Sequence, residues 1–370
     1  MSAQPVPPVP SSAVPQDAVA AAPERNVVDQ APKGEVVLKI TDLCVRFPSD
    51  EGPVNAVQDL TYEARLGRTL AIVGESGSGK SVSSMAVLGL HNPKRSSITG
   101  SILLDGTEIV GADEATLRKL RSNTAAMIFQ DPLSALHPFY KVGNQIAEAY
   151  LAHNSVSKDV ARKRAVEMLE LVGIPNPQRR AKQFPHEFSG GMRQRAMIAL
   201  GLVNNPKLLI ADEPTTALDV TVQAQIMQLL AELQAERKMG LILITHDLGV
   251  VARMADDVAV MYAGRIVESG PVEDIFYRSA HPYTTGLKRA MPGAARTHRK
   301  LVAIAGSPPD LFAVPPGCAY APRCPHAMNI CAVHDPAPSA LGAQHRASCW
   351  LHHPQAPAVA TTPPTMSDTR

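Results

Sequence analysis

The sequence has no long hydrophobic run, no excess of one charge and little cysteine. Its hydrophobic stretches, such as residues 241–244, are far shorter than the ~20 residues that a helix needs to cross a bilayer. The 36 basic and 34 acidic residues leave a formal charge of +2, which argues against a nucleic-acid-binding protein. The N-terminus lacks the basic head and apolar run of a secretory signal. We therefore expect a protein that stays in the cytosol and reaches a membrane only through a partner.

Four of the five cysteines lie in the last part of the chain, at Cys318, Cys324, Cys331 and Cys349. In a reducing cytosol such a group favours a metal or iron–sulfur site over disulfides. The 5, 6 and 17 residues between them match neither common zinc-ribbon nor common ferredoxin spacings. From the residues alone, the four can bind zinc, bind a [4Fe–4S] cluster or remain buried thiols. Cys44, within a predicted strand, is expected to be a small buried hydrophobe. The nearby histidines are expected to be solvated: His326, His334 and His345.

The two ends of the chain differ in composition from its middle. Residues 1–33 are rich in proline and alanine, contain no Phe, Tyr or Trp, and are predicted to be disordered, as are residues 354–370. Between them, strands and helices alternate. Strands that run into functional segments are predicted at 69–73, 125–129, 208–212 and 241–245. The alternation predicts an α/β core, an antiparallel β patch on the N-terminal side and a helical insert near 130–190.

A glycine-rich loop follows the strand at 69–73 and precedes a helix. It reads Gly74, Glu75, Ser76, Gly77, Ser78, Gly79, Lys80, Ser81. The glycines let several backbone N–H groups converge on phosphate oxygens, and the helix N-terminus adds partial positive charge. Lys80 supplies a point charge for the β- and γ-phosphates, and the Ser81 hydroxyl can coordinate Mg²⁺. The strand and helix on either side favour this phosphate site over an incidental glycine-rich turn.

Two adjacent carboxylates, Asp212 and Glu213, end the apolar strand at 208–212. Such a pair is costly at the tip of a buried strand unless a cation or substrate needs it. We expect Asp212 to hold Mg²⁺ and Glu213 to polarise an attacking water as general base. A solvated acidic turn before Pro214 is the alternative.

Three further motifs accompany the glycine-rich loop and the carboxylate pair in a fixed order along the chain. A second glycine-rich helix start lies at Ser189, Gly190 and Gly191, where it can face an anionic phosphate. Gln130 follows the strand at 125–129, and His246 follows the strand at 241–245. Taken together, the motifs resemble the ATP-binding subunit of an ABC transporter. Phe188 and Met192 depart from the commoner leucine and glutamine of the second glycine-rich motif, as variants that importer subunits tolerate.

The resemblance implies a fold and a role for each motif. The fold is a P-loop NTPase of the ABC type, with a RecA-like core, an antiparallel β subdomain and a helical subdomain. Gln130 would bind Mg²⁺ and sense the attacking water, and His246 would contact the γ-phosphate and orient Glu213. Asp219 would lie in the loop that crosses a dimer interface. Phe47 is the candidate to stack on adenine.

The same resemblance implies that ATP is held between two ATPase subunits. Residues 189–191 would cover the γ-phosphate of ATP bound to the second subunit, which is either a paralogue or an identical copy. The segment at 130–138, His281-Pro282-Tyr283-Thr284 and the cysteine pattern resemble those of oligopeptide and dipeptide importers. In that group the cysteines are associated with a [4Fe–4S] cluster. The implied partners are two permeases and a solute-binding protein, and the implied place is the cytoplasmic face of the inner membrane.

The implied domains are an ABC nucleotide-binding domain at 36–290, with its helical subdomain at about 131–190, and a C-terminal extension at 291–353. A soluble ABC ATPase of translation or DNA repair would usually carry two nucleotide domains or long coiled-coil inserts, and neither is visible. A regulatory member without turnover is disfavoured by the intact Glu213 and His246. An importer for nickel or another small solute remains open, because the permease and binding protein select the substrate.

Overall fold

The structure is a computed structural model, and it describes residues 34–216, 218–291, 303–312 and 314–357. The chain divides into two units, residues 1–32 and 33–370, and everything described below belongs to the second. The tail predicted at 1–33 and most of the tail predicted at 354–370 lie outside the described residues.

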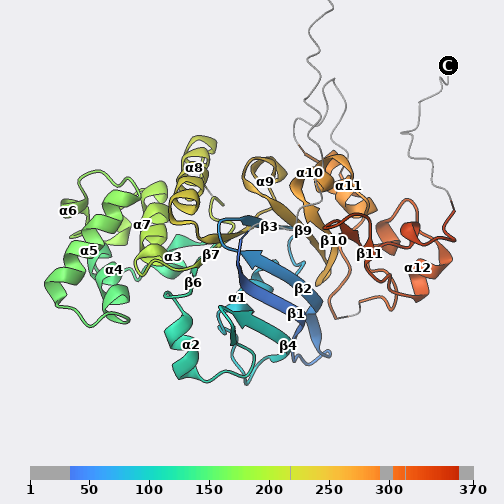
Figure 1. The fold of residues 1–370 in the computed structure, drawn as a ribbon, viewed down its shortest axis with the longest axis horizontal. Coiled ribbons are helices and arrows are strands. Elements are labelled where there is room, and N and C mark those ends of the chain that lie inside the picture. Colours follow the sequence, from blue (N-terminus) through green and yellow to red (C-terminus); the bar gives the residue numbers. More distant parts are fainter. Residues whose placement is uncertain (1–33, 217, 292–302, 313, 358–370) are drawn as a thin grey trace, which may run out of the picture. The chain divides into compact units, whose positions relative to one another are not determined.

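The smaller of two sheets in the described residues is antiparallel, with the strand order β2-β1-β4-β5 (Figure 1). Its strands are β1 (Val36–Phe47), β2 (Val54–Arg65), β4 (Ser97–Leu104) and β5 (Thr107–Glu108). Buried and exposed side chains largely alternate along β2, as expected where one face of a sheet covers a core. That core includes Leu38, Ile40 and Leu60. The antiparallel β subdomain predicted near the N-terminal side is confirmed.

The larger sheet has the strand order β11-β12-β10-β9-β3-β8-β7-β6. Its parallel centre consists of β3 (Thr69–Val73), β6 (Ala125–Ile128), β7 (Leu208–Asp212), β8 (Gly240–Ile244) and β9 (Asp257–Tyr262). Every residue of β3, β6, β7 and β8 is buried, which explains their continuous apolar sequences. Parallel strands bring their carboxyl ends to one edge, so the segments that follow these four strands meet there. The predicted α/β core is confirmed.

The helical insert lies between β6 and β7 in the sequence. It contains α3 (Pro132–Ala135), α4 (Val142–Leu151), α5 (Lys158–Leu171), α6 (Pro177–Arg180), a 3-10 turn at Pro185–Glu187, and α7 (Gly190–Leu202). Ile146 of α4, Met168 of α5 and Ala199 of α7 share one core cluster with Leu230 of α8 (Val220–Arg237). This shared core fixes the start of α7 relative to the sheet, and the predicted helical subdomain is confirmed. Outside the insert, α1 (Lys80–Val87) and α2 (Glu114–Leu120) precede it in the sequence, and α9 (Leu248–Met254) follows β8.

The C-terminal part of the chain continues the larger sheet. Strand β10 (Arg265–Pro271) pairs with β9 on one side and with β12 (Arg346–Ala347) on the other, and β12 pairs with β11 (Ser339–Ala340). The helices and turns of this part are α10 (Val272–Tyr277), α11 (Pro282–Arg289), η2 (Ala321–Arg323), α12 (Asn329–Val333) and η3 (Trp350–His352). Residues far apart in the sequence, 265–271 and 339–347, are therefore joined by backbone pairing.

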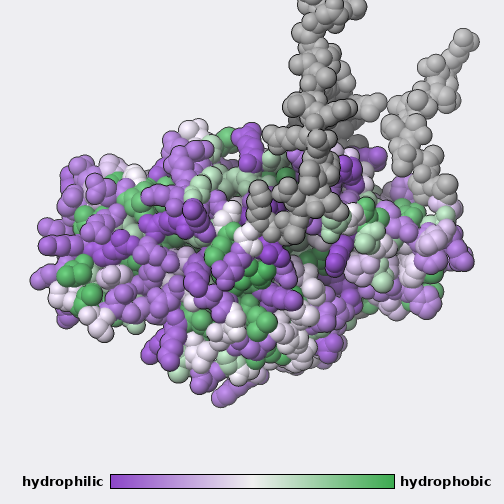
Figure 2. Space-filling view, in the orientation of Figure 1, coloured by the Kyte–Doolittle hydropathy of each residue, from purple (hydrophilic) through white to green (hydrophobic). Residues whose placement is uncertain are grey.

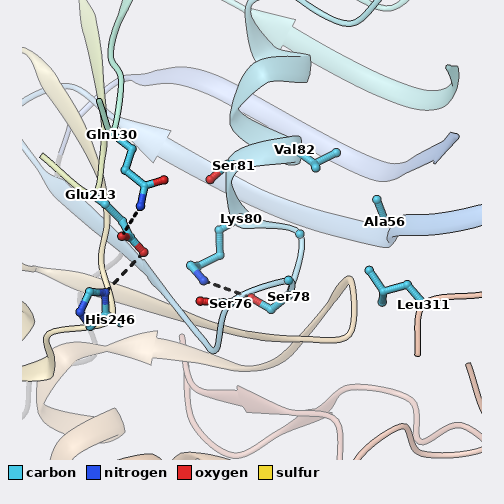
Figure 3. Close-up of a pocket in the computed structure, with 12 residues that line it drawn as sticks. Ala56, Ser76, Ser78, Lys80, Ser81, Val82, Gln130, Glu213, His246 and Leu311 are labelled. Atoms are coloured by element: carbon cyan, nitrogen blue, oxygen red, sulfur yellow. Dashed lines mark hydrogen bonds and ion pairs between the residues drawn. The ribbon is translucent and has the colours of Figure 1, made fainter. Parts of the chain in front are cut away.

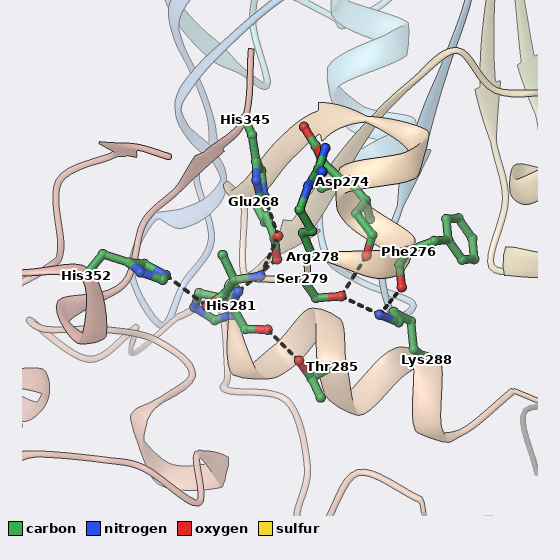
Figure 4. Close-up of polar contacts among 12 residues, drawn as sticks. Glu268, Asp274, Phe276, Arg278, Ser279, His281, Thr285, Lys288, His345 and His352 are labelled. Atoms are coloured by element: carbon green, nitrogen blue, oxygen red, sulfur yellow. Dashed lines mark hydrogen bonds and ion pairs between the residues drawn. The ribbon is translucent and has the colours of Figure 1, made fainter. Parts of the chain in front are cut away.

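The buried carboxylate of Glu268, in β10, links this strand to residues 280–281 and to His345 (Figure 4). The Glu268 side chain is 0% exposed, and its Oε1 accepts the Ala280 N–H at 2.7 Å and lies 2.8 Å from Nε2 of His345. Its Oε2 accepts the His281 N–H at 2.9 Å. These three partners satisfy a carboxylate that burial would otherwise destabilise. The prediction that His345 is solvated is wrong, because its ring is buried against Glu268, whereas His326 and His334 are exposed.

Among the described residues, none of the helices is both long and apolar enough to cross a membrane. Figure 2 shows a largely hydrophilic face on which hydrophobic residues form small scattered groups. Cys44 is partly exposed, so the prediction of a small buried hydrophobe is wrong. Its thiol donates to Oδ1 of Asp59 and accepts the Asp59 N–H across the β1–β2 pair.

Candidate nucleotide site

The segments that follow four strands enclose a cavity of about 440 Å³ (Figure 3). Residues 76–81 form its floor, Gln130 follows β6, Glu213 follows β7, and His246 follows β8. The sequence predicted each of these residues separately. The parallel register of the sheet brings them together, since the strand ends share one edge.

The glycine-rich loop has the backbone that its sequence requires. Gly79 has φ +97°, and a Cβ built on it would lie 2.4 Å from the carbonyl oxygen of Ala56, so no other residue fits there. Lys80 begins α1 and is buried, with its ammonium donating to the carbonyl oxygens of Gly74 at 2.8 Å and Glu75 at 2.9 Å. Burial lowers the pKa of Lys80, while nearby carboxylates, Glu213 first, raise it. The loop thus holds a cation at the point where phosphate is expected.

The first carboxylate of the pair is buried and short of partners. Asp212 is 4% exposed, and its Oδ1 has no hydrogen-bond partner among the described residues. Burial raises the pKa of Asp212, and a hydrogen bond from the Ser81 side chain opposes that rise. A buried carboxylate oxygen without a partner, beside a hydroxyl, fits the oxygen ligands that Mg²⁺ prefers. Ser81 and Asp212 are therefore suited to hold Mg²⁺ next to the phosphate loop.

The second carboxylate is held by three side chains. Glu213 Oε2 accepts from Gln130 Nε2 at 2.9 Å and from the Thr216 hydroxyl at 2.9 Å, and Oε1 lies 3.4 Å from Nδ1 of His246. Glu213 also has φ +44°, a conformation that non-glycine residues rarely adopt and that concentrates at functional sites. The Glu213 side chain is 16% exposed and that of His246 is 70% exposed, so the carboxylate is oriented yet accessible to water.

The second glycine-rich motif lies at the start of α7 and does not line the cavity. Ser189 caps α7, with its hydroxyl accepting the Met192 N–H at 3.3 Å. A Cβ on Gly191 would lie 2.7 Å from a methyl of Val222, so glycine allows α7 to approach α8 closely. Asp219 caps α8 by accepting the Val222 N–H at 2.9 Å. Each residue thus has a structural role within its own subunit, and the predicted contact with a second subunit stays a prediction.

Phe47, the predicted adenine-stacking residue, ends β1 and packs edge-on against His91, with ring centroids 5.5 Å apart. It is not among the residues that line the cavity. Three lining residues escaped prediction from sequence, namely Ala56, Val82 and Leu311. Val82 could have been inferred, because it follows Ser81 in α1. Leu311 carries no local signal, since only the fold brings the C-terminal part of the chain to this cavity.

The four C-terminal cysteines share one environment. Each sulfur accepts a backbone N–H, from Tyr320 to Cys318, His326 to Cys324, Met328 to Cys331 and Leu351 to Cys349. Burial raises the pKa of Cys318 to about 11 and that of Cys349 to about 12, and the other thiols add to both shifts. In the part of the chain that the structure describes, no group of three or more His, Cys, Asp or Glu residues is arranged to hold a metal ion. The N–H donors suit sulfur anions, whereas burial keeps the thiols of Cys318 and Cys349 protonated, and the arrangement of these described cysteines is not that of a metal site.

Comparisons with known proteins agree with this geometry. A family model for ABC transporters matches residues 57–216, and a model for the C-terminal region of oligopeptide/dipeptide transporters matches residues 267–331. The oligopeptide transport ATP-binding protein of Bacillus subtilis is 51% identical over 325 residues, which are 87% of this chain and 91% of that relative. The dipeptide transport ATP-binding protein of the same organism is 48% identical over 323 residues, or 87% and 96% of the two chains.

A solved structure has the same fold. The dimeric structure of an ATP-binding cassette in a post-hydrolysis state, bound to ADP and Pi, is 27% identical, with a TM-score of 0.57. The match covers 64% of this chain and 98% of that cassette. The chain therefore belongs to the ABC transporter family of ATP-binding proteins, within the group of oligopeptide and dipeptide transport subunits. Its enzymatic class follows from the family: it is an ABC-type ATPase.

Proposed function

We propose that this ATPase hydrolyses ATP in the cavity at residues 76–81 and thereby drives the uptake of dipeptides or oligopeptides. The position of Glu213 carries the catalytic part of the proposal, because its carboxylate is held between Gln130 and His246 at the rim of the phosphate loop. The peptide substrate is supported by the relatives, which are named as oligopeptide and dipeptide transport proteins. They favour peptides over nickel or another small solute.

We assign each group one part in the chemistry. The N–H groups of the loop at 74–81 and the Lys80 ammonium would bind the phosphates. Phe47, which packs against His91 outside the residues that line the cavity, stays the candidate from the sequence for stacking on adenine. Ser81, Gln130 and Asp212 would hold Mg²⁺, which would neutralise charge on the phosphates. Glu213 accepts a proton from the attacking water as the water oxygen bonds to the γ-phosphorus. The bond to the bridging oxygen then breaks, and ADP and phosphate leave.

His246 has a supporting part in this step. Its ring lies on the solvent side of Glu213, where it can contact the γ-phosphate and hold the carboxylate in place. We further propose that residues 189–191 complete the pocket of a second ATPase subunit and that Asp219 lies at the interface. The helix N-terminus at Ser189 suits this role, because its N–H groups and dipole favour an anionic group.

The transporter also needs partners in the membrane. We propose that the protein attaches peripherally to the cytoplasmic face, where it acts with two permeases and a solute-binding protein. The segment after Gln130 is suited to the permease contact, since Phe139 is 81% and Tyr140 58% exposed although both are aromatic. The proposed division places the ABC domain at 36–290 and the extension at 291–353.

We also propose that Cys318, Cys324, Cys331 and Cys349 hold a [4Fe–4S] cluster. The backbone N–H donors at the four sulfurs support an anionic sulfur site. Such a group would crosslink a segment that has little apolar core of its own. Anaerobically purified protein should then contain iron and absorb visible light through the sulfur-to-iron band. A colourless, iron-free preparation would contradict the cluster and leave the ATPase proposal untouched.

Two variants test the catalytic assignment. Glu213→Gln keeps a side chain of the same shape without a base, so ATP binding should persist while turnover falls by about 100-fold or more. Lys80→Ala should weaken ATP binding itself. Glu170→Gln, on the exposed side of α5, is the matched control and should leave both properties unchanged. Near-normal turnover by Glu213→Gln would show that another group is the base.

A further inference from the structure

The C-terminal part of the chain grips the phosphate loop through Glu75. Arg323 Nη1 donates to Glu75 Oε2 at 2.6 Å, and Nη2 donates to Oε1 at 3.0 Å. The Arg323 side chain is 5% exposed and that of Glu75 is 26% exposed. Two parallel hydrogen bonds between a guanidinium and a carboxylate fix orientation as well as charge, and shielding from water strengthens them.

Arg323 is itself held before it meets Glu75. Its Nε donates to the carbonyl oxygen of Ala305 at 2.9 Å, and Nη1 also donates to the Tyr262 hydroxyl at 3.2 Å. The guanidinium carbon lies 5.8 Å from the ring centre of Tyr262 and 6.0 Å from that of Tyr320. The backbone of η2 places the residue, and the aromatic cluster orients its side chain. The Arg323 side chain is therefore already ordered, so its contact with Glu75 costs little further conformational entropy.

The main chain of Glu75 is held from the same side. Its N–H donates to the hydroxyl of Tyr283, in α11, at 2.9 Å. Tyr283 is fully buried against Tyr262 and Tyr320, so its hydroxyl is a fixed acceptor. Leu311, from the same part of the chain, lines the nucleotide cavity. The second residue of the phosphate loop thus has both its backbone and its side chain anchored outside the ABC motifs.

Without Arg323, the carboxylate of Glu75 would oppose phosphate binding. The Glu75 carbonyl already accepts the Lys80 ammonium at 2.9 Å, and the carboxylate charge of Glu75 acts on the same ammonium. An unpaired Glu75 would compete with the phosphates for Lys80 and repel them as well. The repulsion would grow with the charge of the nucleotide, from AMP to ATP.

We propose that Arg323 is a positioning residue for ATP: it neutralises Glu75 and holds the phosphate loop in its binding shape. The inference rests on the proposed ATP site at Lys80. It makes the C-terminal extension a working part of the nucleotide pocket. It also accounts for a charged residue inside the loop, where a carboxylate would otherwise weaken the binding of anions.

The test measures the affinities of the full-length protein for AMP and for a non-hydrolysable ATP analogue with Mg²⁺, by titration calorimetry. Arg323→Met should weaken binding of the ATP analogue by about tenfold and binding of AMP by no more than about twofold. Arg323→Lys, which keeps the charge without the two-pronged contact, should lose about threefold for the ATP analogue. In Glu75→Gln/Arg323→Met, no carboxylate is left unpaired, and most of the affinity should return.

The control is Arg265→Met. Arg265 lies 3.4 Å from Asp335 and 2.8 Å from Asp59, so its side chain also ties the C-terminal part to the body of the protein, but through carboxylates outside the phosphate loop. The backbone N–H of the preceding Gly264 donates to the Ser78 carbonyl oxygen, and the substitution keeps that contact. Its loss should leave both affinities within about twofold of the wild type. Should Arg323→Met not fold, Arg323→Lys and the double variant decide the question.

Two results overturn the inference. One is an Arg323→Met protein that binds the ATP analogue as the wild type does. The other is an equal loss for AMP and the ATP analogue that the double variant does not recover, since that pattern means general loosening. Lys80→Ala distinguishes a wrong positioning role for Arg323 from a wrong location of the ATP site. If Lys80→Ala binds normally, the nucleotide site is misplaced, and if only Arg323→Met binds normally, the positioning role alone is lost.

Discussion

The His281 imidazole should make the protein sensitive to mild acid. His281 is 1% exposed, and burial, helped by the nearby His352, lowers its pKa to about 3. Its neutral Nδ1 accepts the Tyr283 N–H at 3.1 Å and so caps α11. In the unfolded chain the pKa of a histidine is about 6.5. Between those two pKa values the unfolded state binds the proton and the folded state does not, so the free energy of unfolding falls as the pH falls.

The size of the effect follows from the difference between the two pKa values. Each pH unit below the unfolded-state pKa of about 6.5 is worth ~1.4 kcal/mol, so the roughly 1.5 units down to pH 5 remove about 2 kcal/mol of stability. His281→Asn retains an acceptor at a position where asparagine caps helices well, and it cannot be protonated. The variant should be less stable than the wild type at pH 7, because a smaller side chain leaves a gap. Its loss between pH 7 and pH 5 should be smaller by about 2 kcal/mol.

The assay is urea unfolding at both pH values, followed by fluorescence of the single tryptophan. Trp350 lies in the same C-terminal part, two residues before His352, which bonds the Ala280 carbonyl at 2.9 Å. The fluorescence therefore reports unfolding of the region that contains His281. His186→Asn, at an exposed ring, controls for loss of an imidazole as such. Equal losses in His281→Asn and the wild type would refute the assignment of a buried, neutral ring.

Three further outcomes follow from the buried groups. Glu268→Ala leaves three hydrogen-bond donors without their acceptor, so the free energy of unfolding should fall by about 3–5 kcal/mol. Hydrogen exchange of the Ala280 and His281 amides should also accelerate. Unchanged exchange rates at these two amides would contradict the network. Asp212→Asn removes a carboxylate whose pKa burial raises, so the nucleotide-free protein should gain about 1 kcal/mol at neutral pH while Mg²⁺-dependent ATP binding is lost. A less stable variant would show that Ser81 and Lys80 offset the cost of burying this carboxylate. Gly79→Ala should abolish ATP binding, since its Cβ would lie 2.4 Å from a carbonyl oxygen, and retained binding would mean that the loop adapts.

The sequence was sufficient for the four buried strands that precede the site residues and for the residues at their ends. Fully buried parallel strands are recognisable as short apolar runs, and β3, β7 and β8 have that composition. Parallel strands place their carboxyl ends together, so predicting the strands also places Lys80, Gln130 and Glu213 near one another. The glycine-rich loop is equally readable, because its backbone shape excludes most other residues.

Contacts of the C-terminal part could not be predicted in this way. Arg323 meets Glu75, and His345 meets Glu268, only because β12 pairs with β10 and carries the extension back to the core. The local sequence around an arginine or a histidine does not indicate a buried partner, since arginine is mostly exposed and histidine has no strong preference for burial. Phe47 is a residue whose sequence context suggested a role that its position in the structure does not support. An aromatic residue at a strand end suits stacking on a base, but here it packs against His91 outside the residues that line the cavity.

The most direct test of the account is the ATP turnover of a strictly monomeric preparation, compared with that of the assembled transporter. Ser189 lies outside the cavity of its own subunit, so Ser189→Arg should bind ATP normally yet abolish turnover in the assembly. Wild-type monomer, verified by sedimentation, should hydrolyse ATP only at a small fraction of the assembled rate. A monomer that turns over ATP at the full rate, unaffected by Ser189→Arg, would contradict a site that two subunits complete.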